Sequence, residues 1–160
     1  MNKLIAYRMV AVVLLLTGAM SAYAQEPDPR LAGVWKRHID RPNIKKDKYI
    51  RVDIEGSEVF VSVKEIGTID DQSFQNYDDA EDITVNSDGS ISFNVYLAKN
   101  EYDEGVYSST WESHTIRVKG GRLISIEKQR GCEKDSKGNI LDDYVIPFGN
   151  YTYFNINDNW

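Results

Sequence analysis

Cysteine and histidine are scarce in this chain. Cys132 is the only cysteine among 160 residues. A single cysteine excludes an internal disulfide, so the thiol is either buried or bonded to another molecule, and burial is favoured because cysteine is often buried. The two histidines, His38 and His114, lie far apart in sequence. Without clustered His and Cys ligands there is no zinc-type motif, and we predict neither a metal nor a cofactor.

Long apolar runs and an excess of positive charge are also missing. After residue 24 no apolar run reaches the roughly 20 residues of a membrane-spanning helix, and no window repeats apolar residues at helical spacing. Asp and Glu number 25 against 19 Lys and Arg, a formal net charge of −6. Such a surface repels nucleic acid and anionic membranes. We therefore predict no nucleic-acid partner and no membrane span in the mature chain.

Residues 1–24 have the pattern of a secretory signal peptide. Lys3 and Arg8 supply positive charge around the start of a short apolar run over 9–16, and Ala22-Tyr23-Ala24 forms a small-x-small cleavage site. The apolar run is too short to anchor the chain in a bilayer. We expect cleavage after Ala24 and a soluble product that is exported to the periplasm or secreted.

Short alternating segments separated by turn residues make up most of the remaining chain. Within 49–54, Ile50, Val52 and Ile54 face one way, and Val59 resumes the pattern after the turn at 55–58. A period of two that is interrupted by a glycine turn and then resumed predicts a hairpin. On this basis we predict nine strands, at 33–39, 49–54, 59–64, 81–85, 91–97, 106–118, 123–128, 141–148 and 151–156.

Nearly all the predicted connections are hairpins, which favours an all-β antiparallel up-and-down meander. We expect the meander to close into a barrel, which removes exposed strand edges; a β-sandwich is the alternative. An extended lead-in over 25–30 would precede one domain over 31–160. The polar segments 40–47 and 67–80 are predicted loops, the second being long enough to serve instead as a lid or an edge strand.

Gly33-Val34-Trp35, at the head of the first predicted strand, resembles the Gly-x-Trp signature of lipocalins and the wider calycin group. Asp142-Asp143-Tyr144 is similar in part to their later Thr-Asp-Tyr signature. The whole chain also resembles the small exported lipocalin-like proteins common in Bacteroides-type bacteria. The resemblance implies a lipocalin-like β-barrel in which Gly33 and Trp35 close one end and the opposite end takes a ligand.

Six aromatic residues are candidates for the ligand pocket, since several lie opposite the aliphatic face of their strands. If the aromatic face is the interior, they line a mixed polar and aromatic pocket; if the aliphatic face is the interior, they form an outer surface that packs across strands or meets a partner. The sequence leaves both arrangements open. The candidates are Tyr49, Tyr96, Tyr107, Trp111, Tyr151 and Tyr153.

The leading functional hypothesis is a non-enzymatic, exported, lipocalin-like protein that binds a small apolar or amphipathic ligand. The alternative is a protein-interaction module, either an inhibitor or a subunit of an envelope assembly, with a filled barrel and a protein partner. We predict no enzyme and no catalytic residue, because neither a nucleophile elbow nor a phosphate-binding glycine loop is present. An enzyme would require a pocket of converging ionisable groups, such as His114 with a carboxylate.

Overall fold

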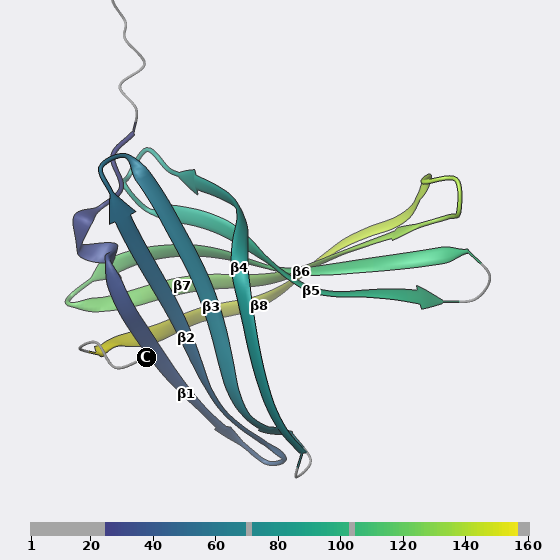
Figure 1. The fold of residues 1–160 in the computed structure, drawn as a ribbon, viewed down its shortest axis with the longest axis horizontal. Helices are drawn as coiled ribbons and strands as arrows, with labels where there is room; N and C mark the ends of the chain where they lie inside the picture. The colour runs from purple at the N-terminus through teal and green to yellow at the C-terminus, as the bar shows by residue number, and fades with distance from the viewer. Residues whose placement is uncertain (1–24, 70–71, 103–104, 157–160) are drawn as a thin grey trace, which may run out of the picture.

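The computed structural model describes residues 25–69, 72–102 and 105–156, so the predicted signal peptide, 1–24, lies outside the described residues. Among the described residues, no helix has both the length and the apolar character needed to cross a membrane. One 3-10 helix precedes eight strands, as Figure 1 shows. They are η1 (Pro29–Leu31), β1 (Gly33–Arg41), β2 (Ile44–Glu55), β3 (Glu58–Ile69), β4 (Gln72–Val85), β5 (Ile91–Tyr102), β6 (Val106–Lys119), β7 (Arg122–Lys134) and β8 (Ile140–Ile156).

The eight strands form a closed barrel in which each strand pairs antiparallel with the next and β8 returns to β1. This confirms the predicted all-β meander and its closure, in preference to the sandwich. Closure is uneven, however. β1 and β8 share three residue pairs and β4 and β5 share four, whereas β6 and β7 share thirteen.

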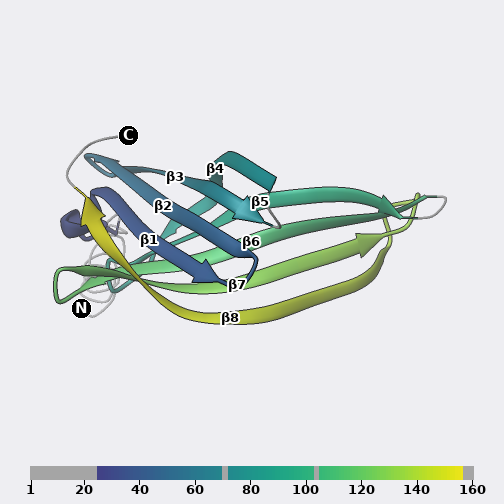
Figure 2. The ribbon, with the colours of Figure 1, turned by 90° about the horizontal axis from the view of Figure 1, so that it is seen from below.

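Two four-stranded halves, β1–β4 and β5–β8, therefore meet along two short seams. They lie together near η1 and diverge away from it, and the far ends of β5–β8 extend beyond the other half (Figure 1; Figure 2). Beyond Lys36, β1 no longer pairs with β8, whose partner residues there end at Phe154. The interior of the barrel is consequently open between the two halves at the end opposite η1.

The predicted loops at 40–47 and 67–80 are wrong. The β1–β2 hairpin turns over Pro42 and Asn43 alone, with Asn43 at a φ of 66°. Segment 67–80 completes β3 and forms most of β4. Strand pairing holds these polar residues, because the hydrogen bonds of an antiparallel ladder join backbone groups and do not require apolar side chains.

Two other predictions need correction at the ends of the domain. The predicted strands 141–148 and 151–156 are a single strand, β8, which absorbs Pro147 and Gly149 at an irregularity opposite Glu127 and Lys128. The strand total is therefore eight. The lead-in is not wholly extended, because its last residues start the short helix η1, where Pro29 occupies the first turn without losing a needed N–H bond.

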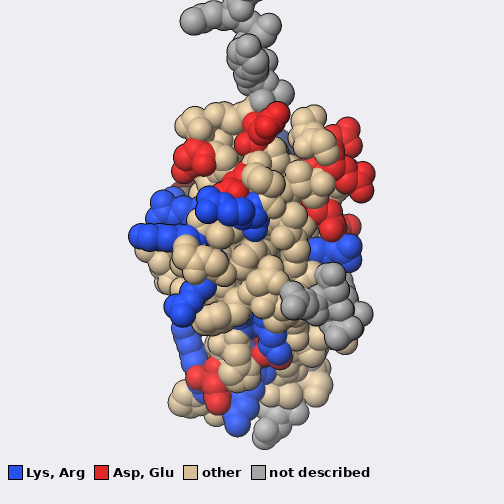
Figure 3. Space-filling view, turned by 90° about the vertical axis from the view of Figure 1, so that its left-hand side faces the viewer, with Lys and Arg blue, Asp and Glu red and all other residues tan. Residues whose placement is uncertain are grey.

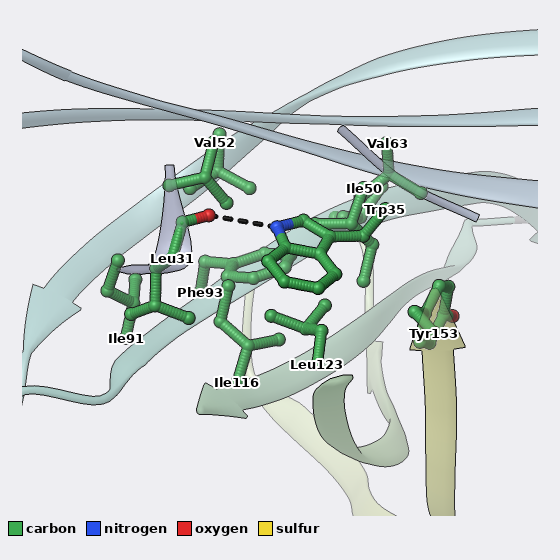
Figure 4. Packing of buried hydrophobic residues seen from close by; sticks show 12 residues of the cluster. Leu31, Trp35, Ile50, Val52, Val63, Ile91, Phe93, Ile116, Leu123 and Tyr153 are labelled. Carbon is green, nitrogen blue, oxygen red and sulfur yellow. Dashed lines mark hydrogen bonds between the residues drawn. The ribbon is translucent and has the colours of Figure 1, made fainter. Parts of the chain in front are cut away.

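The aliphatic face of the strands is the interior face. Ile50, Val52 and Val63 are buried against residues from β5–β8 such as Phe93 and Leu123 (Figure 4). This settles which set of alternating side chains packs together. The residues that alternate with them along each strand form the outer face of the barrel.

Trp35 lies inside this core, at the end that η1 covers. Its indole Nε1 donates a hydrogen bond of 2.9 Å to the carbonyl oxygen of Leu31, drawn in Figure 4. Gly33 has a φ of +125°, and a Cβ there would sit 3.3 Å from Asn155 of β8. The Gly-x-Trp segment thus joins η1, the apolar core and the β1–β8 seam at one place.

Candidate functional site

A layer of charged side chains lies inside the barrel, directly beyond the apolar core. Its position follows from strand alternation, because Lys48 points to the same face as Ile50, two residues later on β2. On β6, Glu112 and His114 share a face with Ile116, and His114 is paired across the ladder with Glu127 of β7. The interior therefore changes from apolar to charged along the axis of the barrel.

Lys48 is the centre of this layer. Its side chain is 3% exposed and its Nζ forms a short ion pair with Glu112 Oε1. The same Nζ lies 3.5 Å from Glu65 Oε1 and 3.6 Å from Glu127 Oε2. Arg37 Nη1 approaches Glu127 from the other side, at 3.5 Å. A buried ammonium thus holds three carboxylates from β3, β6 and β7 around one point.

This arrangement perturbs the acidity of its members. Burial opposes the charged form of Lys48, but Glu112, Glu127 and Glu65 outweigh it and raise the pKa of Lys48. Burial would raise the pKa of Glu112, yet the neighbouring His114 and the charge of Lys48 hold that pKa well below its usual range. Lys48 and Glu112 are therefore both ionised at neutral pH.

His114 and Tyr153 complete the layer at its boundary with the core. The His114 ring stacks on Phe93, with ring centroids 4.8 Å apart, and its Nδ1 lies 3.1 Å from Ser125 Oγ. The Tyr153 hydroxyl donates a hydrogen bond of 2.7 Å to Glu127 Oε1, and burial together with Glu127 raises the pKa of Tyr153 well above 10.0. These contacts fix the side chains in place.

A cavity of about 220 Å³ opens above the charged layer, between β1–β2 and β6–β8. Its floor includes Lys48, Glu112 and Glu127, and its other walls mix apolar and basic side chains. The remaining lining residues are Arg37, Ile39, Arg41, Ile44, Lys46, Phe148 and Tyr151. The cavity lies where β1 and β8 have separated, so it is the opening in the barrel described above.

The six predicted aromatic residues do not share one pocket. Two of them, Tyr151 and Tyr153, lie on the interior face of β8. The Tyr151 ring lines the cavity and packs against the Arg37 guanidinium, whose central carbon is 3.4 Å from the ring centroid. Tyr153 is fully buried in the core below it.

The other four, Tyr49, Tyr96, Tyr107 and Trp111, alternate with interior residues and so occupy the outer face. Tyr49 is paired with Lys36, next to the interior pair of Trp35 and Ile50. Tyr96 and Trp111 meet edge-on, with ring centroids 5.8 Å apart. The prediction that these four residues line the interior pocket is therefore wrong, because strand alternation places their side chains on the outer face.

Trp111 lines a different hollow, an outer groove of about 380 Å³ whose lining residues come from β4 to β8. Cys132 lines the same groove and is partly exposed, so the expected burial of the thiol is incomplete. Arg130 and Asp143 also contribute to this groove, whose lining mixes charged side chains with the apolar surface of residues such as Ile140.

Glu112, His114 and Glu127 are the described residues best placed to hold a metal ion. One ligand atom from each lies within 4.8 Å of the others, and all three residues are buried. His114 Nε2 has no hydrogen-bond partner and lies 3.3 Å from Glu112 Oε1. A divalent cation there would have to displace the Lys48 ammonium, which already neutralises the carboxylates. The prediction that no metal binds stays a prediction.

The turn at 135–139 uses its one carboxylate, that of Asp135, in hydrogen bonds within the turn. Asp135 accepts bonds from the backbone of Lys137 and Asn139 and from the Asn139 side chain, at 2.7 to 2.9 Å. Its carboxylate is thus used to close the β7–β8 hairpin rather than to face a cation.

Chemically, the layer presents fixed charges at Lys48, Glu112 and Glu127, the ionisable groups on the cavity floor. His114 is brought beside two carboxylates, as an enzyme would require, but its side chain has no exposed surface. The prediction of no catalytic activity is not decided by this geometry. The sequence analysis did not identify Lys48, Glu112 or Glu127; their two-residue spacing from buried apolar residues was the available signal.

No family model matches this chain, and no curated protein or solved structure is significantly similar to it. The eight-stranded up-and-down barrel is compatible with a lipocalin-like fold, and this geometrical likeness is what the described residues support.

Proposed function

We propose that the chain is an exported, lipocalin-like binding protein that holds a small amphipathic ligand in the cavity between β1–β2 and β6–β8. The observation that carries the proposal is the composition of that cavity. Ile39, Ile44 and Phe148 supply apolar surface, while Lys48 and Glu112 supply a charged floor. Small-molecule sites typically combine apolar walls with a few fixed polar groups.

The volume of about 220 Å³ suits a small ligand, or one end of a longer ligand that continues between the diverging halves. The charged floor is already internally paired, so it does not need the ligand in order to be stable. The Arg37–Tyr151 contact similarly forms a wall without a ligand. A preformed wall lowers the ordering cost of binding.

Binding of the neutral, environment-sensitive dye Nile red tests the proposal. The mature chain should increase the dye's fluorescence, and Phe148→Ser should weaken that binding severalfold because Phe148 lines the cavity. Phe154→Ser is the matched control, since Phe154 is a comparably exposed aromatic on β8, packed beside Arg122 and absent from the cavity wall.

Equal losses in the two variants, or no dye binding to the wild type, would contradict the proposal. Native mass spectrometry of the gently purified protein provides a second readout. A bound small molecule that is lost on denaturation would support the proposal and give the mass of the ligand.

A specific observation also supports the protein-interaction alternative. The far part of β8 carries exposed Ile140, Leu141 and Val145, at 63%, 56% and 54% exposure. It lies beyond the short β1–β8 seam, so this stretch of β8 has no β1 partner. If it binds a protein, Val145→Lys should abolish capture of that protein while leaving dye binding unchanged.

A further inference from the structure

The cavity is locally basic in an otherwise acidic protein. Four basic side chains line it, against two acidic ones, Glu112 and Glu127, whereas the whole chain has a net charge of −6. The four are Arg37, Arg41, Lys46 and Lys48. Lys and Arg gather over the lower and left-hand parts of the face in Figure 3, and Asp and Glu over its upper part.

Most of these basic groups already have an acidic partner. Lys48 is enclosed by its three carboxylates, and Lys46 Nζ lies 2.7 Å from Glu65 Oε2. Arg37 Nη1 lies 3.5 Å from Glu127 Oε2, and its guanidinium also covers Tyr151. The buried floor is thereby neutralised internally.

Arg41 differs from the others. It is exposed at the end of β1, and it makes no ion pair with any residue in the part of the chain that the structure describes. The register places it opposite Ile44, and both line the cavity. Among the described residues, the mouth therefore presents a positive charge without an ion-pair partner, directly beside apolar surface.

The carboxylates are poorly available to a second cation. Glu112 is paired with Lys48, and Glu127 accepts the Tyr153 hydroxyl while lying near Arg37 and Lys48. A cationic ligand would meet Arg41 at the mouth and paired carboxylates at the floor. An anionic ligand would instead gain attraction from Arg41 without breaking any of these contacts.

We infer that the ligand of this cavity is an amphipathic organic anion, with its charged group at Arg41 and its apolar body against Ile39, Ile44 and Phe148. This inference rests on the proposed function and adds the charge of the ligand to it. A guanidinium beside an apolar wall favours a carboxylate or sulfate over a neutral headgroup of similar size.

Competition with Nile red tests the charge selectivity. Decanoate, decanol and decylamine have the same apolar chain and differ in headgroup, and each is used below its micelle-forming concentration. Decanoate should displace the dye at a concentration about threefold to fivefold lower than decanol or decylamine, the range expected for one exposed charge pair. The preference should weaken as salt is added, because Arg41 is exposed. Decyl sulfate in place of decanoate separates recognition of any anion from recognition of a carboxylate.

Two substitutions locate the selectivity. Arg41→Ala should remove most of the preference for decanoate, and Arg41→Glu should reverse it in favour of decylamine. Lys45→Ala is the matched control: Lys45 is also basic and exposed, lies four residues away, and alternates to the outer face of β2. It should leave the preference unchanged.

The outcomes separate the two proposals. If Nile red binds but the three competitors are equivalent, or if Lys45→Ala and Arg41→Ala act equally, the anion inference is wrong and the binding function stands. If neither Nile red nor decanoate binds, with decanoate followed directly by native mass spectrometry, both are wrong.

Discussion

Replacing Lys48 with methionine removes one ammonium and leaves the surrounding carboxylates in place. Methionine preserves most of the aliphatic length of the side chain, so the main change is in charge. Glu112 and Glu127, at 10% and 3% side-chain exposure, would lose their shared cation. Arg37 would remain near Glu127. Glu112 would keep only His114 beside it, with His114 Nε2 3.3 Å from Glu112 Oε1.

The expected cost can be bounded from the distances. Opposite charges separated by the 3.6 Å between Lys48 and Glu127 attract by about 5 kcal/mol at an effective dielectric of about 20. Desolvation of the buried charges offsets much of that attraction in the wild type. Removing Lys48 leaves the carboxylates buried, so their desolvation cost remains while the attraction is lost. We therefore expect Lys48→Met to lower the free energy of unfolding by about 3–5 kcal/mol.

The pH dependence identifies the cause. In the wild type the pKa of Glu112 is lowered, so its contribution to stability is present above the unfolded value of about 4.3 and is lost as the pH falls through the folded value. Without Lys48, only His114 opposes the effect of burial, so the pKa of Glu112 rises relative to the wild type and the penalty of the substitution grows as the pH rises. The stability difference between the two proteins should therefore shrink on going from neutral pH to about pH 5.

Urea unfolding followed by tryptophan fluorescence measures both quantities. Lys45→Met is the control for loss of an exposed lysine from the same strand, and we expect it to change stability by less than about 0.5 kcal/mol. Lys48→Met combined with Glu112→Gln should recover part of the loss. A cost equal to that of Lys45→Met, or a cost that stays constant with pH, would refute the reasoning.

Three further predictions concern the packing around the site. Trp35→Phe leaves a buried carbonyl without its donor and should cost about 1–3 kcal/mol in urea unfolding, well above Trp111→Phe on the outer face; equal costs would contradict this. Gly131→Ala places a Cβ in overlap with Cζ and the hydroxyl oxygen of Tyr144 and should cost about 1–3 kcal/mol, a loss that Tyr144→Ala should suppress if the overlap is its cause. The raised pKa of Tyr153 makes its contribution to stability present below about pH 10 and lost as the pH rises further, so ultraviolet titration should show one phenolate that appears only on unfolding, and Tyr153→Phe should remove it.

The sequence predicted the barrel because its inner strands alternate cleanly. The turn and the repeated apolar positions around Ile50 and Val61 are local signals that tertiary packing then reinforces. Segment 67–80 gave no such signal, because its residues do not alternate between apolar and polar. Its pairing depends on β3, which lies directly before it and supplies the partner backbone.

The charged layer was harder to predict than the barrel. Isolated Lys and Glu residues on a strand usually indicate its solvent face. Lys48 and Glu112 nevertheless share a face with Ile50 and Ile116, so strict alternation places them inside. Lys48 and Glu112 are 64 residues apart, and they meet across the interior because the closed barrel makes β2 face β6, which no local pattern specifies.

The short seams have a consequence for how the barrel moves. Three pairs between β1 and β8 and four between β4 and β5 hold two halves that are each internally paired over longer ladders. The seam amides should exchange hydrogen with solvent sooner than those of β6 and β7, since opening a seam breaks few bonds. The halves β1–β4 and β5–β8 would then move as two rigid bodies about their paired end. They would separate to admit a ligand and close again without either half unfolding.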